Sequence, residues 1–152
     1  MTAEWRCKKF DALTPYELYA VIRLRNEVFV VEQACIFQDA DNKDQQAYHM
    51  MCWNNDGLLA CSRLLPAFVA YDEVSIGRVA TAVHTRRSGL GRQLMERSVA
   101  ACYSLFGQTT IRIGAQLYLR KFYESFHFVQ SSPVYLEDGI EHMEMVLAAA
   151  RG

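Results

Sequence analysis

Residues 76–106 read IGRVATAVHTRRSGLGRQLMERSVAACYSLF, where the sequence pattern is most specific. They predict a strand, a loop rich in arginine and glycine, and a long helix from Arg92. The first N–H groups of a helix lack intrahelical acceptors, and together with the helix dipole they favour a bound anion. Glycine at positions 89 and 91 would let that ligand approach the backbone. The segment therefore predicts a phosphate-binding site.

The spacing of the loop excludes two common phosphate-binding motifs. It contains no GxxxxGK[ST], as a P-loop would, and no GxGxxG followed about twenty residues later by an acidic residue. What remains is RxxGxG at residues 86–91, which would also fit an ordinary helix-entry turn. Four arginines, Arg78, Arg86, Arg87 and Arg92, surround the turn in a chain of net charge -1, so we expect a local positive field.

Length and composition predict a single domain over residues 1–152. The near-neutral charge argues against a nucleic-acid partner. The five cysteines are scattered without CxxC spacing, as in a cytoplasmic protein with reduced thiols. No apolar run approaches the ~18 residues of a membrane span. A nucleotide-hydrolysing enzyme is disfavoured, because no metal-holding carboxylate follows the loop at a recognisable spacing. No metal site is expected.

The predicted elements alternate between strands and helices. Thr14, Pro15 and Glu17 form a capping box that starts the first helix, and NNDG joins a hairpin. The order predicts an α+β fold with a twisted mixed sheet of about six to seven strands and helices on both faces. Strands are expected at residues 5–10, 48–53, 58–65, 74–81, 110–116, 134–136 and 140–147, with another helix at 117–125.

Charged residues follow in the first helix and the loop after it. Arg25 falls on the apolar face of the helix, so it needs a partner, either in a structural ion pair or as part of a substrate pocket. The loop at residues 31–44 is acidic. Its carboxylates either form a solvated surface or favour a cationic acceptor.

Four blocks of sequence resemble one enzyme family. The RxxGxG loop is similar to the pyrophosphate loop of the GNAT (GCN5-related N-acetyltransferase) superfamily, and AQLYLRKFYESFHF is similar to its motif B. LRNEVFVVEQACIFQDAD, IGRVAT, GAQLYLRKFYESF and YLEDGIEHMEM resemble its ElaA-type branch. The chain departs from that pattern at Ile36 and Phe37, and at His127, where glycine commonly ends the motif B helix. Histidine tolerates left-handed geometry, so the turn can survive.

The resemblance implies a GNAT fold. It also implies an enzyme that transfers an acetyl group from acetyl-CoA to a small amine or a peptide amine. It implies that Tyr123 is the general acid that protonates the departing thiolate. Among four candidate bases, His49, Glu141, His142 and Glu32, we favour the last two. The expected CoA-binding residues are Val79, Ala80, Thr81, Arg86, Arg87, Ser88, Gly89, Leu90, Gly91, Arg92 and Gln116.

Two interpretations of function follow. The chain is either an N-acetyltransferase or a non-catalytic acyl-CoA-binding module that keeps the anion loop without turnover. The presence of Tyr123 together with the intact loop favours the enzyme. An exposed sheet edge or the C-terminal hairpin could pair two copies into a homodimer. The sequence does not identify the acceptor, because fold-level kinship does not determine the substrate.

Overall fold

A computed structural model describes residues 2–149 of the chain. The helices are α1 (Pro15–Arg25), α2 (Leu90–Phe106) and α3 (Arg120–Glu124), with a π-helical turn η2 (Asn26–Glu32) directly after α1 and short 3₁₀ turns elsewhere. The strands are β1 (Glu4–Lys9), β2 (Tyr48–Asn54), β3 (Gly57–Leu65), β4 (Val74–Thr81), β5 (Ile111–Gln116), β6 (Val129–Gln130), β7 (Tyr135–Glu137) and β8 (Ile140–Leu147).

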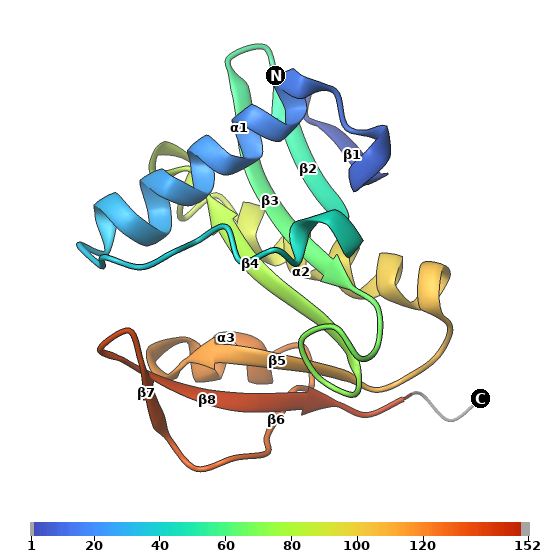
Figure 1. The fold of residues 1–152 in the computed structure, drawn as a ribbon, viewed down its shortest axis with the longest axis vertical. Helices are drawn as coiled ribbons and strands as arrows, with labels where there is room; N and C mark the ends of the chain where they lie inside the picture. The colour runs from blue at the N-terminus through green and yellow to red at the C-terminus, as the bar shows by residue number, and fades with distance from the viewer. Residues whose placement is uncertain (1, 150–152) are drawn as a thin grey trace.

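All eight strands belong to one sheet with the order β1-β2-β3-β4-β5-β8-β6, and β7 also pairs with β8 (Figure 1). The pairing of β4 with β5 is parallel, and the other pairings are antiparallel. The predicted mixed sheet is therefore confirmed. The expected strand at residues 134–136 is β7, and the sheet has one further short strand that was not predicted, β6.

The predicted capping box begins α1. The backbone N–H of Glu17 donates to Thr14 Oγ1 at 3.1 Å, and the Glu17 carboxylate accepts from the Thr14 N–H at 2.9 Å. Arg6 and Lys8 of β1 bind the same carboxylate at 3.1 and 3.0 Å. The cap thus also fastens the start of the helix to the edge strand.

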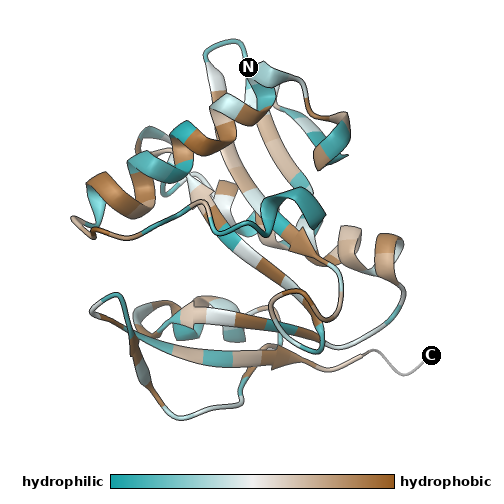
Figure 2. Ribbon diagram, viewed as in Figure 1, coloured by the Kyte–Doolittle hydropathy of each residue, from teal (hydrophilic) through white to brown (hydrophobic). Residues whose placement is uncertain are grey.

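The helices cover both faces of the sheet, as predicted. On one face, Val21, Leu24 and Val28 pack with the side chains of Met51, Cys61 and Ala80 from the central strands. On the other face, α2 and α3 bury two further clusters, which include Leu94, Met95, Tyr123 and Phe128. Figure 2 shows the resulting alternation of apolar and polar bands along α1.

A bulge separates the ends of β4 and β5. Cys61 of β3 pairs with Ala80, but Arg63 pairs with Gly77, so β4 carries an extra residue there, and Arg78 has φ +48°. The parallel ladder consists of Val74 with Ile111 and Ser75 with Arg112. Beyond these pairs the two strands diverge (Figure 1), because a bulge bends and twists the strand that carries it.

Two details differ from the sequence-based expectations. The helix α2 begins at Leu90 instead of Arg92, with Gly89 as its N-cap. The first helix does not end before Val31 but continues as the π-helical turn to Glu32. Within residues 2–149, no helix has the length and hydropathy needed to cross a membrane.

Candidate active site

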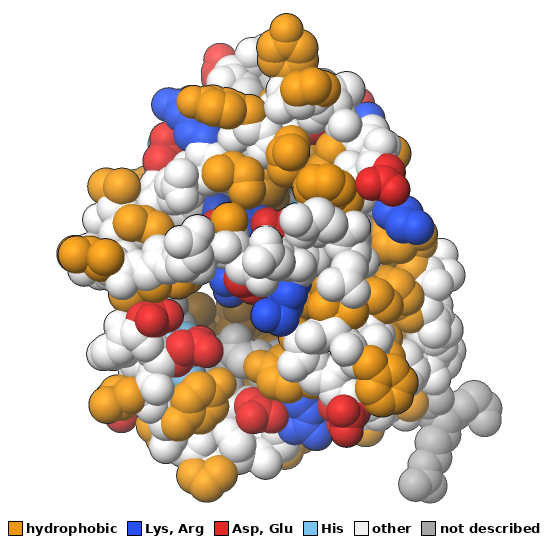
Figure 3. Space-filling view, in the orientation of Figure 1, with side chains coloured by type: hydrophobic (Ala, Val, Ile, Leu, Met, Phe, Trp, Pro, Cys, Tyr) orange, Lys and Arg blue, Asp and Glu red, His pale blue; other side chains and the backbone are white. Residues whose placement is uncertain are grey.

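A cavity of about 810 Å³ occupies the space between the diverging ends of β4 and β5. Its walls come from segments far apart in the sequence. The residues that line it include Glu32, Gln33, Cys35, Arg78, Val79, Ala80, Thr81, Arg86, Gly91, Gln116, Tyr123, Glu137, Asp138 and His142. Figure 3 shows the hollow from outside, between the upper part of the molecule and the β5–β8 part.

The arginine- and glycine-rich loop closes one end of this cavity. Arg87 and Gly89 have φ +66° and +84°, so the chain turns through left-handed geometry just before α2. Ser88 Oγ donates to the Thr85 carbonyl and fixes the turn. Gly91 lies in the first turn of α2 and lines the cavity. The loop therefore presents the N-terminus of α2, a helix of 17 residues, to the cavity. The sequence predicted this succession of loop and helix.

The arginines of this region have different partners. Arg86 makes a two-pronged ion pair with Glu32, and its Nη2 also donates to the Thr81 carbonyl at 3.2 Å. Arg92 lies over the ring of Phe126, 4.6 Å from the centroid, and donates to Ser125 Oγ at 3.0 Å. The side chain of Arg92 thereby links the start of α2 to the end of α3.

The expectation that Arg78 adds to the positive field of the loop is wrong. The bulge directs Arg78 toward the loop after α1, where its Nε lies 2.8 Å from Asp39 Oδ1 and its Nη2 lies 3.3 Å from Asp41 Oδ2. Sequence reasoning missed this because it had no signal for the bulge.

Arg25 makes a structural ion pair. Its Nε donates to Asp39 at 2.8 Å, and its two other nitrogens donate to Asp44 at 2.9 and 3.2 Å. Arg63 joins the cluster by donating to Asp41 at 2.7 Å and to Asp44 at 3.0 Å. Of the two interpretations of Arg25, the structure favours the ion pair.

The acidic loop at residues 31–44 is thus neutralised. Three arginines, Arg25, Arg63 and Arg78, balance Asp39, Asp41 and Asp44, and Arg86 balances Glu32. The interpretation of this loop as a solvated surface is wrong for its three aspartates. The expectation that the loop attracts a cation is not supported either, because each of these carboxylates already has a guanidinium partner.

Tyr123 lies at the inner wall of the cavity on α3. It is 7% exposed, and its ring packs edge-on against Phe122 and Phe128. Burial raises the pKa of Tyr123 to about 12 because the phenolate would be poorly solvated there. The phenol is therefore protonated over the whole physiological pH range. His127, four residues on, has φ +74°, which confirms that it can end the turn in place of glycine.

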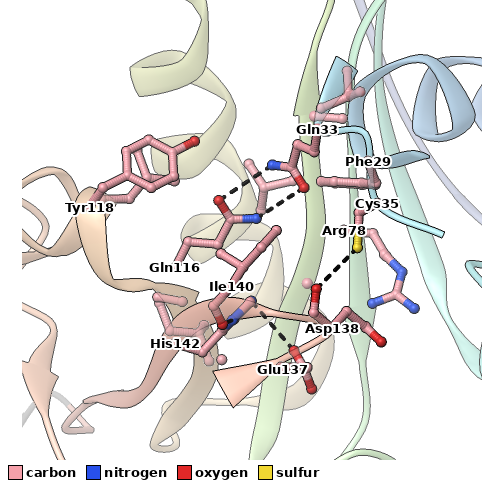
Figure 4. A pocket seen from close by; sticks show the side chains of 18 of the residues that line it. Phe29, Gln33, Cys35, Arg78, Gln116, Tyr118, Glu137, Asp138, Ile140 and His142 are labelled. Carbon is pink, nitrogen blue, oxygen red and sulfur yellow. Dashed lines mark hydrogen bonds and ion pairs between the residues drawn. The ribbon is translucent and has the colours of Figure 1, made fainter. Parts of the chain in front are cut away.

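His142 lies on β8 at the same cavity, and its imidazole is held from three sides. Its Nδ1 lies 2.7 Å from the Ile140 carbonyl, so Nδ1 carries the proton in the neutral ring. The Tyr135 ring stacks on the imidazole, with 6.0 Å between the ring centroids and 25° between the ring planes. Its Nε2 lies 3.4 Å from Glu137 Oε2 (Figure 4). The neutral ring thus has its lone pair on Nε2.

The other candidate bases are placed less favourably. The hydrogen bond from Arg86 lowers the pKa of Glu32, which makes this carboxylate a weaker base. His49 is buried outside the cavity, its Nε2 lies 3.0 Å from the Asp44 carbonyl, and burial lowers its pKa. Glu141 is exposed on β8 and does not line the cavity. His142 is the candidate base whose environment best fits that role.

Two contacts hold the segment after α1 across the cavity (Figure 4). The side-chain amides of Gln33 and Gln116 donate to each other at 3.3 Å. Cys35 Sγ donates to the Asp138 carbonyl at 3.3 Å. Sequence reasoning identified Gln116 but missed Gln33, Cys35 and Glu137, because only the fold brings these distant segments together.

The open parallel pair, the helix N-terminus beside it and the buried phenol define a class of protein, the acyltransferases that use a CoA-linked donor. Residues 23–149 match the family model described as the acetyltransferase (GNAT) domain, and the chain belongs to this family. It belongs to the ElaA-type branch, since protein ElaA of Escherichia coli is 38% identical over 144 residues, covering 93% of this chain and 94% of that protein.

Solved structures give the same result. A crystal structure of an acyl-CoA N-acyltransferase from Pseudomonas aeruginosa superposes with a TM-score of 0.93 at 42% identity, covering 97% of this chain and 100% of that one. The crystal structure of Escherichia coli ElaA gives a TM-score of 0.90 at 37% identity, covering 95% of this chain and 99% of that one.

Proposed function

We propose that the protein transfers an acetyl group from acetyl-CoA to the amino group of a small amine or a peptide. The observation that carries this proposal is the shared cavity: Gly91 of the anion loop, Tyr123 and His142 all line one space of about 810 Å³. A diphosphate group at the loop and a thioester near the phenol would therefore belong to a single ligand.

The residues around the cavity fit such a ligand. Beyond Ser75 the edge of β4 that faces β5 is released from the parallel ladder, so main-chain groups of Val79, Ala80 and Thr81 can pair with the amides of pantetheine. The N–H groups at residues 86–92 (Arg86, Arg87, Ser88, Gly89, Leu90, Gly91 and Arg92) can bind the diphosphate. Gln116 can bind pantetheine or the acceptor, but it would then exchange its hydrogen bond with Gln33.

Acetyl-CoA supplies the activated acyl group, and attack by the amine forms a C–N bond while the C–S bond breaks. Tyr123 donates a hydrogen bond to the departing sulfur. Its pKa of about 12 lies above the ~8.5 of an ordinary thiol, so complete proton transfer from the phenol is uphill. Tyr123 therefore keeps its proton and stabilises the developing thiolate by hydrogen bonding, and CoA leaves as the thiolate.

His142 removes the proton that the amine nitrogen loses. Its Nε2 has the lone pair, because Nδ1 donates to the Ile140 carbonyl. After proton transfer, the imidazolium would be stabilised by the Glu137 carboxylate 3.4 Å away. In this proposal Glu32 is not the base. Its carboxylate binds Arg86 and shapes the wall of the cavity.

The test is the release of free thiol from acetyl-CoA in the presence of a panel of amines, run beside calorimetric titration with CoA. An N-acetyltransferase binds CoA and releases thiol only when a suitable amine is present. The alternative, a non-catalytic acyl-CoA-binding module, would bind CoA without amine-dependent thiol release. Failure to bind CoA would overturn both.

A further inference from the structure

The charges that line the cavity are not balanced once the ion pairs are counted. Glu32 pairs with Arg86, and Asp41 pairs with Arg63 and Arg78. Glu137 and Asp138 also line the cavity, and within residues 2–149 no lysine or arginine lies within ion-pair distance of either carboxylate. The part of the cavity wall beside His142 therefore carries two carboxylates that the lining arginines do not pair with.

These two carboxylates lie in a constrained turn. Glu137 ends β7, and Asp138 and Gly139 have φ +52° and +78° before β8 begins. The Asp138 carbonyl accepts from Cys35 Sγ of the opposite wall, so the turn is fastened across the cavity (Figure 4). Acidic side chains are visible at the rim of the hollow in Figure 3. The turn thus places both carboxylates at the exposed rim of the cavity.

Glu137 also connects the rim to the candidate base. Its Oε2 lies 3.4 Å from His142 Nε2, and its side chain is 60% exposed. An ammonium group attracted to Glu137 from solvent would arrive beside the imidazole that is proposed to take its proton. The opposite end of the cavity holds the N-terminus of α2, whose N–H groups favour an anion, so the two substrates would bind at ends of opposite preference.

We propose that Glu137 and Asp138 select acceptors that carry a second positive charge, namely diamines or polyamines, over neutral amines and amino acids. This inference rests on the proposed acetyl transfer. Two carboxylates attract a dication more strongly than a monocation, and they repel a ligand that bears its own carboxylate. Because the rim is partly solvated, we expect a preference of about tenfold that weakens as ionic strength rises.

The experiment compares three acceptors of equal chain length: 1,4-diaminobutane, 1-aminobutane and 4-aminobutanoate. In the wild-type protein, kcat/KM is expected to be about tenfold higher for the diamine than for the monoamine, and lowest for the amino acid. The double variant E137Q/D138N is expected to bring the ratio of diamine to monoamine close to one. The matched control is E141Q, which removes an exposed carboxylate of the neighbouring strand outside the cavity and should leave the ratio unchanged.

The outcomes separate this inference from the proposed function. Acetylation of all three amines with a ratio near one in the wild type overturns the selection and leaves acetyl transfer standing. A preference for 4-aminobutanoate also overturns it, because two free carboxylates would repel that acceptor. If none is acetylated, calorimetric titration of the diamine and the monoamine into the CoA-saturated protein decides: tighter binding of the diamine, lost in E137Q/D138N, supports the selection, and equal binding overturns it. Failure of CoA to bind overturns both proposals.

Discussion

Ser75 pairs with Arg112 in the parallel ladder between β4 and β5, and beyond this pair the two strands part to form the walls of the cavity. The bulge at Arg78 accounts for the opening, because it bends β4 away. The cavity joins a helix N-terminus to a buried phenol and an oriented imidazole.

Tyr123→Phe should lower turnover by roughly 10² to 10⁴, because the departing thiolate loses its hydrogen-bond donor. Affinity for CoA should change little, since the anion loop is intact. The measurement is steady-state thiol release together with calorimetric titration of CoA. Tyr103→Phe is the control, because Tyr103 lies on α2 outside the cavity. Equal turnover in both variants would remove Tyr123 from the reaction.

Gly89→Ala should destabilise the protein by about 1 kcal/mol, because alanine is strained at φ +84°. It should also weaken CoA binding, because the turn before α2 shapes the anion site. Gly107→Ala is a control at the opposite end of α2, with φ +91° and no other atom within 4 Å of the added Cβ. Its ψ of 175° disfavours alanine more strongly than the left-handed geometry of Gly89 does, so Gly107→Ala should lose at least as much stability in urea. Only Gly89→Ala should lose CoA affinity. Similar losses of affinity would contradict the loop assignment.

His142→Gln should lower kcat/KM by roughly 10², because the proton acceptor is gone. Glu32→Gln should lower kcat/KM less, since the hydrogen bond from Arg86 already lowers the pKa of Glu32 and makes it a weaker base. The measurement is kcat/KM for one amine at one fixed pH. A value in His142→Gln equal to that of the wild type would rule out this base.

Arg25→Met should destabilise the fold by about 3 to 5 kcal/mol, because it leaves Asp39 and Asp44 buried without their main partner. Arg23→Met, two residues earlier on the same helix, removes only an exposed pair with Glu27 and should cost less than about 0.5 kcal/mol. Urea unfolding at neutral pH measures both. Similar losses would mean that the buried cluster contributes no more than a surface pair.

Stability should fall at acidic pH. Burial alone would raise the pKa of Asp41, but the hydrogen bond from Arg63 and the nearby arginines lower it to about 2. Burial would also raise the pKa of Glu17. Hydrogen bonds from the Thr14 N–H, Lys8 and Arg6 lower it to about 2 instead. These values lie below those of the unfolded chain, about 4. The contribution to stability is therefore complete above pH 4 to 5 and is lost as the pH falls toward 2.

Thermal unfolding between pH 2 and 6 measures this loss. Asp41→Asn should be less stable at pH 6, and its midpoint should depend less steeply on pH below 4. An unchanged slope would contradict the depressed pKa of Asp41.

Local sequence signals predicted the elements of the fold well. Thr14, Pro15 and Glu17 specify the start of α1 through contacts within three residues, and NNDG specifies its hairpin. The glycine at 89 likewise marked the start of α2 to within a few residues. Such signals depend on neighbours in the chain, so they can be interpreted without knowing the fold.

Features that depend on distant pairing could not be predicted in this way. One extra residue in β4 turns Arg78 from the anion loop toward Asp39 and Asp41, and no local pattern announces a bulge at that position. The partner of Gln33 is 83 residues away. That no lysine or arginine in residues 2–149 pairs with Glu137 becomes visible only after the ion pairs of the other carboxylates are known.

The most direct test of the account is a crystal structure of the protein with bound CoA. The account predicts that the diphosphate contacts the N–H groups at residues 86–91, that pantetheine lies between β4 and β5 beside Val79 and Ala80, and that the sulfur approaches the Tyr123 hydroxyl. CoA bound outside this cavity, or with its sulfur directed away from Tyr123, would contradict it.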